Sequence, residues 1–124
     1  YNHGKMARDF TFINDLIESI FRLSNKIPHL DDKFDSDSLS NIAPYRIVNI
    51  GNSKKIKLMD MIEALERKLN KKSKRNFLPM QIGDVKETQA DISLLKELTS
   101  YYPQTSIEEG VSKFIDWYLK YYQV

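Results

Sequence analysis

Two short stretches carry residue types suited to holding a ligand, and the first is Arg8-Asp9-Phe10-Thr11-Phe12-Ile13. Its guanidinium precedes an apolar run with strand character, and such a group can grip phosphate oxygens through two parallel N–H donors. The same guanidinium could instead pair with a nearby carboxylate such as Asp9. The residues by themselves leave both interpretations open.

The second stretch is Pro79-Met80-Gln81-Ile82-Gly83-Asp84. Gly83 lets the backbone approach a ligand closely, and the carboxylate of Asp84 can accept both hydrogen bonds of a ribose diol. Gln81 could add an amide toward a phosphate or a sugar, whereas Asp84 could instead be an ordinary turn residue. Together with Arg8, this stretch suggests half of a nucleotide-sugar site.

The chain offers little catalytic chemistry. Its two histidines, His3 and His29, lie in segments predicted to be irregular. Neither a Gly-x-Ser-x-Gly elbow nor a Gly-x-x-x-x-Gly-Lys loop is present, and the four glycines are too far apart for a dinucleotide fingerprint. Tyr1 and Lys5 have a Tyr-x-x-x-Lys spacing, but Gly4 between them disfavours the helix that this catalytic pair needs. We therefore assign no catalytic, cofactor-binding or metal-binding residue.

The composition is that of one ordinary globular domain over 1–124. With 41% hydrophobic residues and a net charge of +2, the chain lacks the clustered basic face typical of nucleic-acid binding. The absence of cysteine excludes disulfides and Cys-ligated zinc. No apolar run is long enough to span a membrane and no signal peptide is visible, so we expect a cytoplasmic protein without membrane or nucleic-acid partners.

Two charged runs are expected to be solvated rather than functional. Lys71–Arg75 indicates the end of a helix, where cations complement the helix dipole. Asp31–Asp37 lacks the twelve-residue loop of a calcium site, with its central Gly and closing Glu, and it indicates a flexible loop over 28–43.

Hydrophobic periodicity and helix-start signals predict an α/β fold with more helix than sheet. The expected elements are a strand at 7–13, a helix from Asn14 or Asp15 to about 26, a strand at 45–50, a helix at 58–69, an extended piece at 77–80, a helix from Asp91, and a helix from 105 to about 122. The apolar run at 45–50 is typical of a strand covered on both faces, as in a parallel sheet.

Each predicted helix has an apolar side that should pack against a neighbour. These sides comprise Leu16, Ile17, Ile20 and Phe21, with Leu23 as a further candidate; Leu58, Met61, Ile62, Leu65 and Leu69; Ile92, Leu95 and Leu98; and Ile107, Val111, Phe114, Ile115, Tyr118 and Tyr121 or Tyr122. The first of these sides and the run at 45–50 require cover from a larger domain. This chain should therefore expose them as an apolar patch.

Beyond these local patterns, the sequence resembles the C-terminal half of extended short-chain dehydrogenase/reductase epimerases of sugar nucleotides. The resemblance rests on Tyr1-Asn2-His3-Gly4-Lys5-Met6-Ala7-Arg8-Asp9-Phe10, Pro44-Tyr45-Arg46-Ile47-Val48-Asn49-Ile50-Gly51-Asn52, Leu78-Pro79-Met80-Gln81 with Gly83-Asp84-Val85, and Thr88-Gln89-Ala90-Asp91. The Pro-Met-Gln-x-Gly-Asp-Val stretch is the most specific, and it is similar to the UDP-glucuronate 4-epimerase branch.

The resemblance implies both a fold and a set of roles. The fold is the helix-rich C-terminal portion of a Rossmann-type epimerase, with few short strands and about four helices. Arg8 would contact the diphosphate of a UDP-sugar, Asp84 the ribose hydroxyls, and Gln81 either of the two. Tyr1 and Asn2 would border the uracil.

The resemblance also implies the activity of a longer parent, an isomerase of carbohydrate metabolism that uses NAD to convert UDP-glucuronate to UDP-galacturonate. Since the chain begins at Tyr1 without a methionine, we expect a fragment that lacks the N-terminal NAD-binding Rossmann domain and is inactive alone. The parent is expected to be a homodimer. The alternatives are another sugar-nucleotide epimerase or dehydratase, or a non-catalytic module that binds nucleotide sugars.

Overall fold

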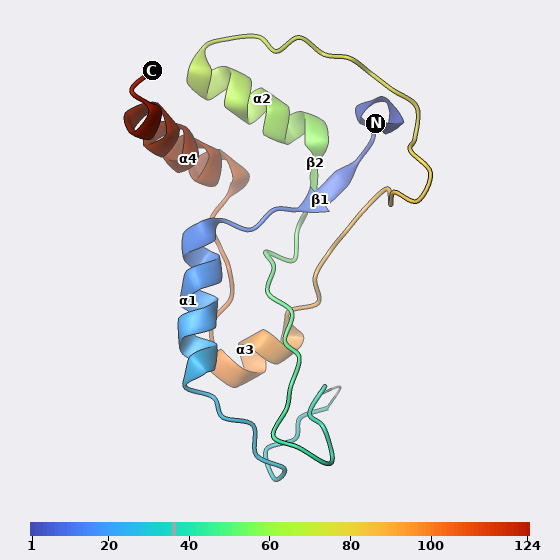
Figure 1. The fold of residues 1–124 in the computed structure, drawn as a ribbon, viewed down its shortest axis with the longest axis vertical. Helices are drawn as coiled ribbons and strands as arrows, with labels where there is room; N and C mark the ends of the chain where they lie inside the picture. Colours follow the sequence, from blue (N-terminus) through green and yellow to red (C-terminus); the bar gives the residue numbers. More distant parts are fainter. Residues whose placement is uncertain (36) are drawn as a thin grey trace. The chain divides into compact units, whose positions relative to one another are not determined.

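The computed structural model describes residues 1–35 and 37–124. Within them, four α-helices and a two-stranded sheet follow a 3₁₀ turn at Asn2–Gly4 (Figure 1). The elements are β1 (Ala7–Asp9), α1 (Ile13–Ser24), β2 (Lys55–Lys57), α2 (Leu58–Leu69), α3 (Ser93–Thr99) and α4 (Ile107–Tyr122). The helix-rich α/β fold expected from the sequence is confirmed.

The chain divides into two compact units. Residues 1–10, 54–89 and 105–124 form the first unit, and residues 11–53 and 90–104 form the second. The expectation of a single domain over 1–124 stays a prediction. No helix in the described residues combines the length and the apolar character required to cross a membrane.

The core of the first unit lies between α2 and α4, drawn in green and dark red in Figure 1. Ala64, Val111 and Ile115 are buried there, with Met61, Leu65 and Ile107 packed around them. The predicted start of α4 is confirmed, because the hydroxyl of Ser106 accepts a hydrogen bond from the Glu109 amide at 3.2 Å.

The sheet of the first unit is smaller than the sequence predicts. β1 pairs antiparallel with β2, so that Arg8 lies opposite Ile56, and β1 ends at Asp9 rather than at residue 13. The sequence prediction lacks β2, because three residues are too few to give a periodic signal.

The core of the second unit lies between α1 and α3. Ile92, Leu95 and Leu98 are buried as predicted, at 3%, 0% and 8% exposure. By contrast, the predicted apolar side of α1 is not buried, since Ile17 and Phe21 are 56% and 65% exposed. This exposure confirms the expectation that the chain presents an uncovered apolar patch.

The predicted strand at 45–50 is wrong. The segment is irregular, and Ile47 is 59% exposed. The run bonds to the preceding loop and not to a strand: the Ser40 amide donates to the Tyr45 carbonyl at 2.9 Å. The Ile47 amide donates to the Ser38 hydroxyl, and that hydroxyl donates to the Ile47 carbonyl. An apolar run forms a strand only where a neighbouring strand pairs with it over several residues, and within the described residues of the second unit this run has no partner strand.

Candidate functional site

Arg8 reaches its position because β1 is flanked on two sides by backbone partners. On one side β2 pairs with it, and on the other the Ala7 amide donates to the Lys86 carbonyl at 3.0 Å. The Thr88 amide donates to the Ala7 carbonyl at 3.2 Å. The segment that follows Asp84 is therefore fastened beside the strand that carries Arg8.

Asp84 closes a turn that its sequence favours. The Asp84 amide donates to the Gln81 carbonyl at 3.3 Å, and Gly83, the third residue of this four-residue turn, has a φ of 85°. A positive φ at the third position is typical of a type II turn, where glycine is preferred. The turn projects the Asp84 carboxylate toward Arg8.

The two predicted ligand groups meet in an ion pair. Arg8 Nη2 lies 2.9 Å from Asp84 Oδ1, and the two side chains are 27% and 32% exposed. Arg8 Nη1 also donates to the carbonyls of Ala7 at 2.9 Å and Lys86 at 3.1 Å. The pairing with Asp9 that the sequence left open does not occur, because successive side chains on a strand point to opposite faces.

The other three predicted site residues lie in the same unit. Gln81 is exposed and begins the turn that Asp84 ends. The Asn2 amide side chain donates to the Lys5 carbonyl at 2.7 Å, which leaves it a local role in the N-terminal turn. Tyr1 is 54% exposed. The N-terminal turn is tied to the second stretch, because the His3 amide donates to the Leu78 carbonyl at 2.9 Å.

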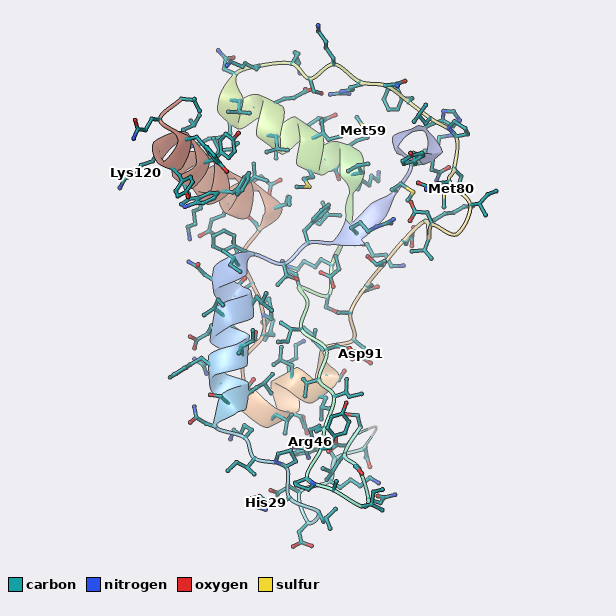
Figure 2. The ribbon with its side chains drawn as sticks, viewed as in Figure 1. His29, Arg46, Met59, Met80, Asp91 and Lys120 are labelled. Carbon is teal, nitrogen blue, oxygen red and sulfur yellow. The ribbon has the colours of Figure 1, made fainter. Side chains whose placement is uncertain are left out.

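A cavity of about 490 Å³ adjoins this region. It lies between α2 and the segment 71–77, and Tyr1 and Gly4 also line it. Figure 2 labels Met59, one of the lining residues, at the start of α2, and Met80 beside the N-terminal turn. Glycine is favoured at position 4, because its φ is 77° and a Cβ there would lie 3.0 Å from Met59 Sδ and from Phe77 Cε1.

The sequence missed a buried carboxylate at the edge of this cavity. Glu66 accepts hydrogen bonds from the amide and hydroxyl of Ser73 at 3.0 and 2.6 Å, from Lys72 Nζ at 3.0 Å and from Arg75 Nη2 at 2.9 Å. The Ser73 bonds, followed by those from Lys72 and Arg75, hold the pKa of Glu66 far below its usual range. Lys72 and Arg75 are thus partners of Glu66, which corrects the expectation of a merely solvated helix end.

A signal for this cluster was present in the sequence. Glu66 follows Leu58 and Ile62 at intervals of four, so a charged residue continues the apolar side of a helix. A carboxylate in such a place needs donors, and the basic run directly after the helix supplies them.

The second unit contains a second buried pair, formed by Arg46 and Asp37. Arg46 Nε and Nη2 donate to the two Asp37 oxygens at 3.0 and 2.8 Å, and these side chains are 4% and 0% exposed. Figure 2 labels Arg46 and, in the same loop region, His29. Over the described parts of 28–43 the chain forms no helix or strand, as predicted, and the flexibility of this loop stays a prediction.

In the described residues, no three His, Cys, Asp or Glu side chains lie close enough together to hold a metal ion. What the Arg8–Asp84 region offers is a cation and a carboxylate side by side, both open to solvent. This combination suits a ligand that carries an anion next to hydroxyl groups.

The chain is similar in sequence and in structure to UDP-glucuronate 4-epimerases. No family model matches the chain. A probable UDP-glucuronate 4-epimerase from Rhizobium meliloti is 42% identical over 99% of the chain, and Protein CapI from Staphylococcus aureus is 44% identical, also over 99%. The UDP-glucuronic acid 4-epimerase of Bacillus cereus, solved with UDP-glucuronic acid and NAD, superposes on 98% of the chain with 30% identity and a TM-score of 0.74.

The chain corresponds to the C-terminal part of UDP-glucuronate 4-epimerase-like proteins. It spans 38% of the length of Protein CapI, 37% of the Rhizobium protein and 35% of the Bacillus cereus chain. The predicted resemblance to UDP-glucuronate 4-epimerase-like proteins is therefore confirmed for this part. None of these comparisons tests the individual roles predicted for Arg8, Gln81, Asp84, Tyr1 and Asn2.

Proposed function

We propose that this chain forms the UDP-sugar-binding part of a nucleotide-sugar epimerase that converts UDP-glucuronate to UDP-galacturonate. The observation that carries the proposal is the meeting of Arg8 and Asp84, 76 residues apart in sequence, at 2.9 Å on an accessible surface. The similarity to UDP-glucuronate 4-epimerase-like proteins supports the choice of sugar.

In this proposal each predicted residue has a distinct task. Arg8 binds the diphosphate, because a guanidinium offers charged donors to phosphate oxygens. Asp84 accepts hydrogen bonds from the ribose hydroxyls, and Gln81 lies beside the diphosphate or the ribose. Tyr1 and Asn2 border the uracil.

The proposed reaction also requires NAD, which the Bacillus cereus epimerase contains. The residues of this chain do not fit that cofactor, because its four glycines are widely separated and form no phosphate-cradling loop. We therefore propose that an N-terminal Rossmann domain of a longer parent binds NAD and supplies the catalytic residues, so that the 124-residue chain alone is inactive. Cytoplasmic location and a homodimeric parent stay predictions.

The test is an assay of the full-length parent with a panel of UDP-sugars, in which UDP-glucuronate should be converted most efficiently. Arg8→Ala should raise KM by about 10- to 150-fold, because a hydrogen bond to a charged group contributes about 1.5–3 kcal/mol. Arg22→Ala is a suitable control, since Arg22 is a surface residue paired with Glu18. An unchanged kcat/KM in Arg8→Ala would remove Arg8 from the site.

The panel also separates the alternatives. Efficient conversion of a different sugar nucleotide would indicate another epimerase or a dehydratase. Binding of UDP-sugars without turnover of any of them would indicate a non-catalytic binding module.

A further inference from the structure

The pairing of Arg8 with Asp84 has a consequence for which ligands the site accepts. Both hydrogens of Arg8 Nη1 are committed to the carbonyls of Ala7 and Lys86, so the guanidinium cannot easily turn. Nη2 donates to Asp84. An incoming phosphate therefore meets a fixed cation with a carboxylate already in place beside it.

We propose that Asp84, held beside Arg8 by this ion pair, selects nucleoside diphosphates over pyrophosphate and simple phosphates, because any phosphate that binds Arg8 is placed next to this carboxylate. This inference rests on the proposed function, which it extends from binding to selectivity. Its basis is the 2.9 Å contact between two partly exposed side chains.

The balance of donors and acceptors explains the selectivity. When a phosphate binds the guanidinium, Asp84 shares its cationic partner with a second anion that lies close to it. Pyrophosphate has almost no donors to offer in return, so its binding leaves the carboxylate uncompensated. A ribose offers two hydroxyl donors to the carboxylate, and these hydrogen bonds offset the repulsion between Asp84 and the phosphate.

The surroundings of Asp84 and Arg8 leave polar atoms available to a ligand. Oδ1 accepts from the Val85 amide at 2.8 Å as well as from Arg8, so the carboxylate stays anchored while Arg8 binds a phosphate. Oδ2 of Asp84 and Nε of Arg8 make no hydrogen bond with any described residue, so both are available to a ligand. At Gly83 no atom lies within 4 Å of the position that a Cβ would take, so the turn does not obstruct the approach.

The experiment is calorimetric titration of the full-length parent with two probes, inorganic pyrophosphate and UDP. The measured quantity is the ratio of the two Kd values, pyrophosphate over UDP. In Asp84→Asn, pyrophosphate should bind more tightly and UDP more weakly, so the ratio should fall by about tenfold or more. Arg8→Gln should weaken the binding of both probes.

Glu87→Gln is the matched control. Glu87 is a nearby carboxylate on the same segment, paired with Lys55 at 2.7 Å, and its replacement removes the same charge without touching Arg8. The ratio of the two Kd values should stay within about twofold of that of the unsubstituted full-length protein, since exposed charges at a distance are screened by salt. An equal fall in this control would show a general charge effect and overturn the inference.

The outcomes separate this inference from the proposed function. UDP binding and UDP-glucuronate conversion by the parent, with an unchanged ratio in Asp84→Asn, would overturn only the selective role of Asp84. Failure of the parent to bind UDP would overturn the proposed function and the inference with it. Circular dichroism of Asp84→Asn, and of Asp84→Ser as a second variant, distinguishes lost selectivity from lost folding.

Discussion

Replacing Arg46 with methionine should destabilise the second unit strongly. The change removes the two hydrogen bonds that Arg46 donates to Asp37 and the bond from Nη2 to the Asp32 carbonyl, and it leaves the buried Asp37 carboxylate without its cation. Removing one partner of a buried ion pair costs about 3–5 kcal/mol, because the remaining charge has no compensation. The lower figure applies here, because amides of Phe34 and Leu39 still donate to Asp37.

The assay is equilibrium unfolding followed by circular dichroism, with hydrogen exchange at the Leu39 amide as a local probe. A loss of about 3 kcal/mol should lower Tm by roughly 12 °C, at about 4 °C for each kcal/mol in a chain of this size. Glu18→Gln is the control, since its exposed pair with Arg22 should contribute only about 0.3–0.5 kcal/mol. Adding Asp37→Leu to Arg46→Met should recover much of the loss.

Acid titration gives a second readout of the same pair. Burial by itself raises the pKa of Asp37, but the hydrogen bonds from Arg46 and from the Phe34 and Leu39 amides outweigh it, so the pKa lies below its usual 3.8. The stabilisation is thus present above pH 3.8 and lost as the pH falls through the lower folded pKa. The reasoning would be refuted if the free energy of unfolding of Arg46→Met lay within about 0.5 kcal/mol of that of the unsubstituted chain and the acid profile were the same.

Three further predictions concern other parts of the chain. Glu66→Gln should lower Tm at neutral pH and reduce the loss of stability below pH 4.5. The pKa of Glu66 is lowered in the folded state, so its contribution to stability is present above pH 4.5 and is lost in acid. Acid denaturation curves measure this, and identical curves for the variant and the unsubstituted chain would contradict it. Gly4→Ala should destabilise more than Gly83→Ala in urea unfolding, because both have a positive φ, costing about 1–2 kcal/mol, but only Gly4 also meets neighbouring atoms at 3.0 Å; equal losses would argue against that packing. Ile17→Lys with Ile20→Lys should leave Tm nearly unchanged and reduce binding of a hydrophobic dye, since both side chains are about half exposed; a large fall in Tm would show that this face is covered.

Helices were the part of the fold that local sequence could predict. The expected helix at 58–69 coincides with α2, and the start of α4 follows from Ser106 and the acidic residues after it. These signals act within one or two helical turns, so no distant partner is needed to interpret them. The run at 45–50 failed for the opposite reason, because a strand depends on a neighbour that sequence does not reveal.

For the candidate site, residue types alone identified Arg8 as a donor to phosphate and Asp84 as an acceptor for a ribose diol. These hydrogen-bonding properties belong to the side chains themselves, so the sequence is enough to predict them. Which carboxylate Arg8 would face depended on the tertiary structure. The fastening of Lys86 and Thr88 beside β1 brings Asp84 to Arg8, while the pleat of the strand turns Asp9 away. Chemical capacity is a local property of a residue, whereas the pairing of two groups 76 residues apart is settled only by the backbone bonds between their segments.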